Sequence, residues 1–114
     1  MPGRDWRFRV EDIISAIAKI CEFTKDADYS VFVANEMTVD AVIRNLEIIG
    51  EAARHIPAEI ETKYPDIEWQ EMRAIRNILI HEYFGVDLAV VWHTVKKDLP
   101  PLLSKLRDVL ARER

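Results

Sequence analysis

The 114-residue sequence predicts an all-α protein: an antiparallel four-helix bundle with one or two short extra helices. Apolar residues recur at three- and four-residue spacing in every long segment, which is the period of an amphipathic helix. The 3 Gly and 5 Pro are too few for the tight turns of a β-sandwich or for a Gly/Pro-rich disordered chain. No linker, repeat or low-complexity tract divides the chain, so we expect a single helical domain over residues 1–114.

The first long helix is predicted over residues 5–25. Its apolar stripe consists of Val10, Ile13, Ile14, Ile17, Ile20, Cys21 and Phe23. Asp26, Asp28 and Tyr29 interrupt the pattern, and a short helix is expected at 30–35.

The second long helix is predicted over residues 38–55. Its stripe consists of Val39, Val42, Ile43, Leu46, Ile49 and Ala53. Gly50 inside this helix costs about 1 kcal/mol relative to Ala, which suggests that a neighbouring helix approaches closely at that point. Pro57 ends the helix, and a short helix at 58–63 is expected before Pro65.

The third long helix is predicted over residues 68–82 and is followed by Gly85, a residue suited to a left-handed helix cap. Its inward residues are Trp69, Met72, Ile75, Ile78 and Leu79. Asp87 is positioned to cap a fourth helix, in which Pro100 and Pro101 introduce a kink or a restart. The inward residues of this helix are Leu88, Val91, Trp92, Val95, Leu102, Leu103, Leu106, Val109 and Leu110.

Composition excludes several classes of protein. Sixteen basic and 20 acidic residues give a net charge of −4, which excludes the broad basic surface of a general nucleic-acid binder but leaves room for a small basic site. The single Cys21 excludes an internal disulfide and a Cys-based zinc site. The chain shows no signal peptide and no run of about 20 apolar residues, so we expect a cytoplasmic protein with no membrane segment.

Chemistry is concentrated at the end of the third helix, where Arg73, Arg76, Asn77 and His81 form a local basic patch. Asn77 and His81 are four residues apart and share a face, whereas His81 lies about 140° round an ideal helix from Arg76. Arg76 and His81 would therefore meet if the helix end is distorted, or if a second copy faces the first across a twofold axis.

This patch is suited to cleavage of an RNA phosphodiester without a metal ion. His81 would move the proton of a ribose 2′-hydroxyl or of the leaving oxygen, and Arg76 would stabilise charge on the phosphate. Asn77 would orient the histidine or hold a phosphate oxygen. The His residues are not spaced as metal ligands, so no metal site is expected. The alternative is a solvated helix face, with the arginines paired to Glu71 or Glu82.

The same residues carry a resemblance to a known family. The stretch from Arg76 to Tyr83, RNILIHEY, matches the R-x4-H-x-Y motif of the HepT-like family of HEPN-domain proteins. Residues 44–52, RNLEIIGEA, resemble the family's second-helix signature. Residues 83–87, followed by 91–92 and 96–100, are similar to its closing segment, so the likeness runs in order along nearly the whole chain.

The resemblance implies a homodimeric ribonuclease toxin from a two-gene toxin–antitoxin module. Its partner would be an MntA-type minimal nucleotidyltransferase, which silences the toxin by transferring AMP from ATP to the motif tyrosine. By position, Arg76 and His81 would be the catalytic pair, Asn77 a supporting residue and Tyr83 the AMPylated residue. Arg73 is added from spacing and charge as an RNA phosphate contact. No cofactor is expected, because ATP would be used by the partner.

Two other functions remain open at the level of sequence. The chain could be a non-catalytic, nucleotide- or partner-binding subunit of a nucleotidyltransferase complex, which would be modified but would cleave no RNA. It could also be a plain helical interaction protein, in which substitution of the motif residues would have no effect on RNA.

Overall fold

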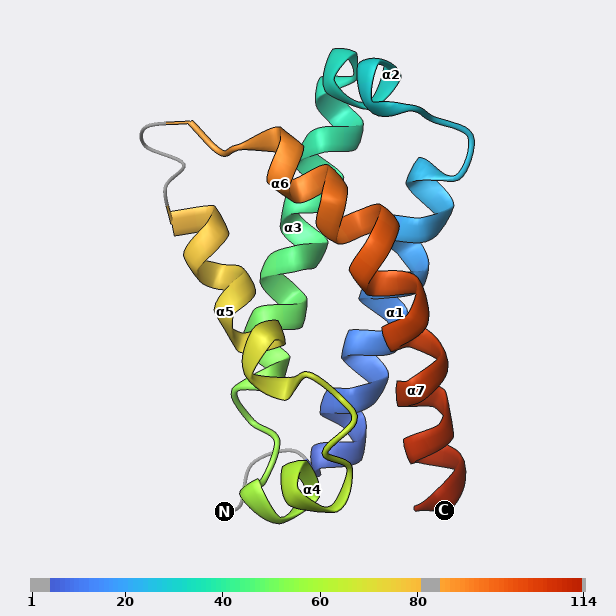
Figure 1. The fold of residues 1–114 in the computed structure, drawn as a ribbon, viewed down its shortest axis with the longest axis vertical. Coiled ribbons are helices and arrows are strands. Elements are labelled where there is room, and N and C mark those ends of the chain that lie inside the picture. Colours follow the sequence, from blue (N-terminus) through green and yellow to red (C-terminus); the bar gives the residue numbers. More distant parts are fainter. Residues whose placement is uncertain (1–4, 81–84, 114) are drawn as a thin grey trace.

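A computed structural model describes residues 5–80 and 85–113. Four antiparallel rods form the bundle: α1 (Trp6–Thr24), α3 (Glu36–Ala53), α5 (Trp69–Ile80) and a continuous run of α6 (Leu88–His93), η2 (Thr94–Asp98) and α7 (Leu99–Arg112) (Figure 1). Two short helices, α2 (Tyr29–Ala34) and α4 (Ala58–Lys63), cover opposite ends. The described residues contain no strand. The predicted four-helix bundle with short extra helices is therefore confirmed.

α1 begins after Asp5, whose carboxylate accepts a hydrogen bond from the backbone N–H of Arg7 at 2.8 Å. The predicted stripe is buried along most of the helix, but Phe23 is 45% exposed and its assignment to the stripe was wrong. Four residues after Ile20, the inward position belongs to Thr24. Its hydroxyl donates to the Ile20 carbonyl at 2.8 Å, which allows a polar side chain to be buried there.

Short polar side chains determine where α2 and α3 begin. The Asp28 carboxylate caps α2 through the N–H of Val31, and the Asn35 amide oxygen caps α3 through the N–H of Thr38. Because Asn35 acts as the cap, α3 starts two residues earlier than the apolar pattern predicted. Phe32 anchors α2 by stacking on Trp92 of α6, with ring centroids 4.9 Å apart.

α4 ends beside the last residues of the chain. Lys63 forms an ion pair with Glu113 at 2.6 Å, and the Tyr64 hydroxyl donates to the same carboxylate. The Trp69 indole N–H donates to the Tyr64 carbonyl at 3.0 Å, which fixes the start of α5. The helix predicted at 58–63 is confirmed at its stated bounds.

The predicted interruption near Pro100 and Pro101 is a π-helical segment followed by a restart. Asp87 caps α6 as predicted, accepting from the N–H groups of Ala89 and Val90. Pro100 and Pro101 occupy the first turn of α7. Neither proline can donate a backbone hydrogen bond to the preceding turn. The residues of that turn form the wider π-helical segment η2 instead of a regular α-helical turn.

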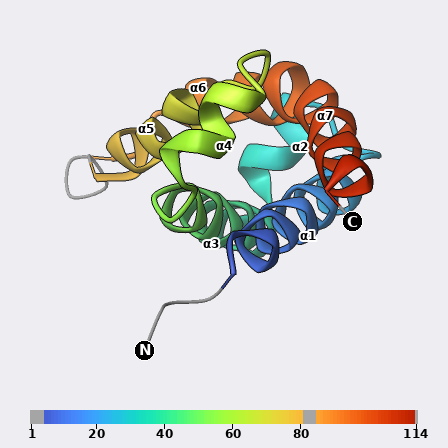
Figure 2. The ribbon, with the colours of Figure 1, turned by 90° about the horizontal axis from the view of Figure 1, so that it is seen from below.

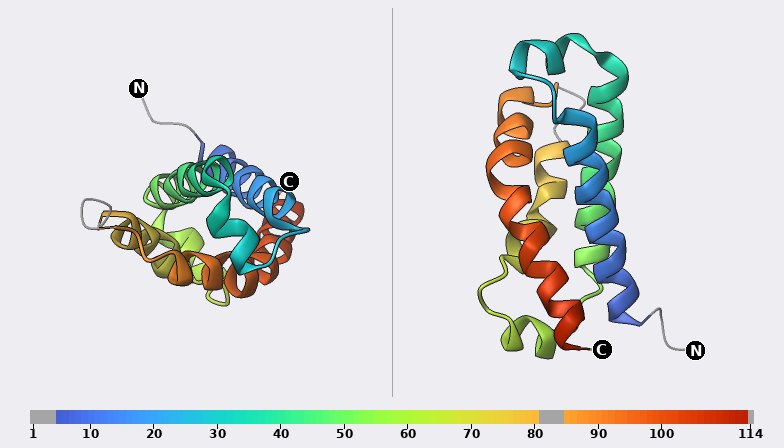
Figure 3. Two further views of the ribbon diagram at one scale, coloured as in Figure 1. Left: turned by 90° about the horizontal axis from the view of Figure 1, so that it is seen from above. Right: turned by 90° about the vertical axis from the view of Figure 1, so that its right-hand side faces the viewer.

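The four rods do not pack equally against one another. Among the described residues, α1 packs on α3, α3 packs on α5, and α7 packs on α1, whereas α5 and α7 do not pack closely on each other. Views along and across the bundle show this arrangement, with α4 over one end and α2 over the other (Figures 2 and 3). The open side between α5 and α7 bears on the candidate site. None of the helices in the described segments is long and apolar enough to cross a membrane.

Candidate functional site

α5 carries three of the predicted site residues and directs them to three different surroundings. Its buried face is formed by Trp69, Met72, Ile75 and Leu79, which attach the helix to the core. The remaining positions, Arg73, Arg76 and Asn77, lie outside that face because successive residues rotate by about 100°. The basic patch predicted from sequence is therefore divided among neighbouring elements.

Arg73 is occupied by an ion pair. Its guanidinium lies 2.5 Å from the carboxylate of Glu61 on α4, and both side chains are about one-third or less exposed. The sequence had offered Glu71 or Glu82 as partners on the same helix, but the partner comes from another helix. Glu61 therefore competes with a phosphate for the Arg73 guanidinium.

Arg76 lies against α3 at Gly50. A Cβ atom built on Gly50 would stand 2.8 Å from Cγ of Arg76, closer than real contacts allow. The close approach of a neighbouring helix predicted for Gly50 is thus confirmed, and the neighbour is α5. Arg76 is exposed and has no ion-pair partner within the described part of the chain. Its charge remains available to an anion.

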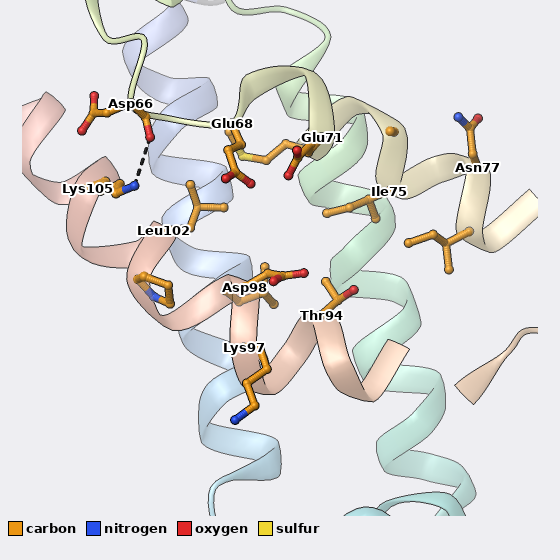
Figure 4. Close-up of a pocket in the computed structure, with 15 residues that line it drawn as sticks. Asp66, Glu68, Glu71, Ile75, Asn77, Thr94, Lys97, Asp98, Leu102 and Lys105 are labelled. Atoms are coloured by element: carbon orange, nitrogen blue, oxygen red, sulfur yellow. Dashed lines mark hydrogen bonds between the residues drawn. The ribbon is translucent and has the colours of Figure 1, made fainter. Parts of the chain in front are cut away.

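Asn77 lies at the edge of a groove between α5 and the η2–α7 run, with its amide directed away from the centre of the groove (Figure 4). The groove has a volume of about 570 Å³. Its apolar lining includes Met72, Ile75, Ile78, Leu99 and Leu102. Asn77 and Arg76 are adjacent in sequence, yet the first lines this groove and the second lies over α3.

The groove is also rimmed by carboxylates. Glu68, Glu71 and Asp98 point into the same region in Figure 4, with Lys97 and Lys105 further along the rim. A hydrogen bond with Glu68 and the charge of Glu68 raise the pKa of Glu71, and loss of solvation and the charge of Asp98 act in the same direction. Repulsion makes this rim unsuitable for the phosphates of RNA.

His81 and Tyr83, the second half of the motif, lie outside the described residues. The chain is described again from Gly85, whose φ of +95° is a left-handed conformation that glycine adopts without strain. Asp87 then caps α6. The described residues contain no group of three or more His, Cys, Asp or Glu side chains arranged to hold a metal ion.

Two features near the site could not be found from the sequence. Glu61 and Arg73 are 12 residues apart on different helices, and no local spacing signals their contact. Glu68 and Asp98, far apart in the sequence, line the same groove. Gly50 did leave a signal, since a glycine inside an otherwise regular helix needs a packing reason.

Comparison with known proteins decides the family. The profile of the family described as "Ribonuclease HepT-like" matches residues 13–109. The chain belongs to the HepT-like ribonuclease family. It is 49% identical over 100 residues to a protein of Thermococcus cleftensis named "Probable ribonuclease HepT", covering 88% of this chain and 91% of the relative.

A second relative covers the chain almost completely. A protein of Methanocaldococcus jannaschii named "Putative RNase MJ1380" is 45% identical over 109 residues, covering 96% of this chain and all of the relative. No solved structure matches the chain significantly. The HepT-like resemblance seen in the motif is confirmed, and with it the relation to ribonucleases.

Proposed function

We propose that this HepT-like protein is a metal-independent endoribonuclease in which Arg76 and His81 form the catalytic pair. The observation that carries the proposal is the exposed Arg76 near the end of α5, which has no ion-pair partner among residues 5–80 and 85–113 and stands five residues before His81 in a chain of this family. His81 would accept the 2′-hydroxyl proton and return a proton to the leaving 5′-oxygen. The Arg76 guanidinium would stabilise the negative charge that develops on the phosphate.

The other motif residues have supporting roles in this proposal. Asn77, on the groove side of α5, would contact His81 or a phosphate oxygen of RNA. Arg73 would add a phosphate contact in competition with Glu61. The acidic rim of the groove supports a site confined to the helix end, because repulsion keeps the RNA backbone away from the rim.

We propose a homodimer in which a second copy packs on the groove side of α5. The groove offers apolar walls, and its rim carries both Glu68, Glu71 and Asp98 and the cations Lys97 and Lys105. A twofold axis could place the acidic part of one rim against the basic part of the other. Such pairing would also supply two copies of His81 and Arg76 to a shared region.

We propose that the chain is the toxin of a two-gene module acting in the cytoplasm. An MntA-type nucleotidyltransferase would silence it by transferring AMP from ATP to the hydroxyl of Tyr83, releasing pyrophosphate. The modification would place a phosphate and a nucleotide two residues from His81. Charge repulsion and occlusion would then prevent RNA from binding.

The experiment for the activity is cleavage of RNA by purified protein in the presence of a chelator, compared with His81→Ala. We expect cleavage by the wild type only, with the variant folded. Cleavage that requires an added metal would contradict the mechanism. The experiment for the switch is the mass of the Tyr83 peptide after co-expression with the partner, for which Tyr83→Phe is the control. The expected gain is one or more AMP groups, absent in Tyr83→Phe.

A further inference from the structure

Gly50 lies in the last turn of α3, in the second-helix segment that the activity described above does not use. It is buried, and its Cα faces Arg76 of α5. A methyl group at this position would meet Cγ of Arg76 at 2.8 Å, and the Arg76 Cδ and backbone nitrogen at 3.6 Å. Only the first distance is a clash, because 3.6 Å is ordinary van der Waals separation.

The identity of the clashing atom determines what would move. The position of Cγ is set by χ1 alone, and χ1 is restricted to staggered values about 120° apart. In a helix one of those three values is already disfavoured by the preceding turn. A side chain at position 50 would therefore force Arg76 into another χ1 rotamer, and the guanidinium at the end of the side chain would swing to a different place.

We propose that Gly50 is a positioning residue for Arg76: the absence of a side chain on α3 holds the arginine in the one rotamer that presents its guanidinium to the scissile phosphate. This inference rests on the proposed catalytic role of Arg76. Gly50 itself touches no substrate. It acts by leaving space for the Arg76 side chain between two packed helices.

The backbone distances show that the fold can accept an alanine here. The Arg76 nitrogen would be in normal contact with the new methyl group, so α3 and α5 need not separate. Alanine also favours a helix interior more than glycine does. Gly50→Ala should therefore fold, which separates loss of position from loss of structure.

The first measurement is the kinetics of RNA cleavage by Gly50→Ala. We expect kcat to fall by on the order of 10- to 100-fold with little change in KM, because misplacement of a charge-stabilising group affects the transition state most. Ile49→Val is the matched control, since it removes one methyl group from a fully buried side chain at the neighbouring position of α3. The control should lower Tm and keep the kcat of the wild type.

The second measurement is independent of activity. Arg76→Ala removes Cγ and with it the clash. Gly50→Ala should then raise Tm in the Arg76→Ala background and raise it less, or lower it, in the wild type. Additive changes in Tm would overturn the contact, and an unchanged kcat in Gly50→Ala would overturn the positioning role. If the Tm values show this coupling but the wild-type protein cleaves no RNA, the contact would stand and the proposed ribonuclease function would be contradicted.

Discussion

The guanidinium of Arg73 on α5 is paired with the carboxylate of Glu61 on α4 at 2.5 Å. One turn further along α5, Arg76 has no such partner among the described residues. Two arginines that look equivalent in the sequence therefore have different availability for RNA. The ion pair partly neutralises Arg73, so Arg76 is the more available positive charge near the end of α5.

Because Glu61 is paired with Arg73, removing the Glu61 charge is expected to raise the affinity for RNA. Glu61→Gln should strengthen RNA binding and steepen its salt dependence by about one phosphate contact, because Arg73 loses its competing carboxylate. Filter binding across a salt series, with His81→Ala in the background to prevent cleavage, measures both effects. Adding Arg73→Gln should abolish the gain. Identical binding by Glu61→Gln and its parent would place Arg73 outside the path of the RNA.

Arg76→Lys tests whether the shape of the guanidinium matters as well as its charge. We expect cleavage between that of the wild type and that of Arg76→Ala, because lysine keeps the charge but lacks the planar fork that binds two phosphate oxygens. Single-turnover rates at saturating protein give the comparison. If Arg76→Lys cleaved RNA at the wild-type rate, the positive charge of Arg76 alone would account for its role, and the shape of the guanidinium would not matter.

The carboxylates in the groove predict a pH-dependent stability. The pKa of Glu71 is raised by Glu68, so the folded state holds this proton more tightly than the unfolded state. The stabilising effect of that proton is complete below the ordinary value of 4.5 and is lost as pH rises through the raised pKa. Glu71→Gln should therefore have a higher Tm than wild type at pH 7, and the difference should shrink to zero as the solution is acidified.

A matched substitution makes the Glu71 result specific. Glu11→Gln removes an exposed carboxylate from α1, away from the groove, and leaves the overall charge the same as in Glu71→Gln. It should give no comparable gain in Tm at pH 7, because Glu11 lies outside the groove that Glu68 and Asp98 line. An equal gain in Tm in both variants would attribute the effect to net charge instead of the Glu68–Glu71 contact.

The proposed dimer predicts complementation between inactive variants if Arg76 and His81 come from different copies. Co-expressed Arg76→Ala and His81→Ala chains would form mixed dimers in which one of the two sites is intact. Cleavage should recover to about a quarter of the wild-type level, since half of the dimers are mixed and each has one working site. Two tags on the chains verify the mixing. Verified mixed dimers without activity would place both residues in the same copy.

The sequence was sufficient for the arrangement of the helices but not for the directions of the site residues. The spacing of apolar residues locates α1, α3 and α5, because a helix with one buried face has apolar residues every three or four positions. It misplaced Phe23, since the residue that is buried at the end of α1 is Thr24, whose hydroxyl is satisfied within its own helix. Contacts between helices, such as Arg73 with Glu61, leave no local pattern.

The candidate site illustrates the same distinction. The motif identified Arg76 and Asn77 as neighbours in one patch, but Arg76 lies against α3 and Asn77 lies at the edge of the groove beside η2. Gly50 is the exception, because its cost within a helix signalled the close packing that the structure contains. His81 and Tyr83 remain predictions from the motif, since they lie outside the described residues.

The central claim is that Arg76 and His81 act together in one metal-free cleavage site. The most direct test is the rate of RNA cleavage in the presence of a chelator by wild type, Arg76→Ala, His81→Ala and the double variant. We predict that each single variant loses at least about 100-fold in rate and that the double variant is no slower than the slower single one, as expected of residues that act as a unit. Multiplicative losses, or a single variant that retains the wild-type rate, would contradict this account.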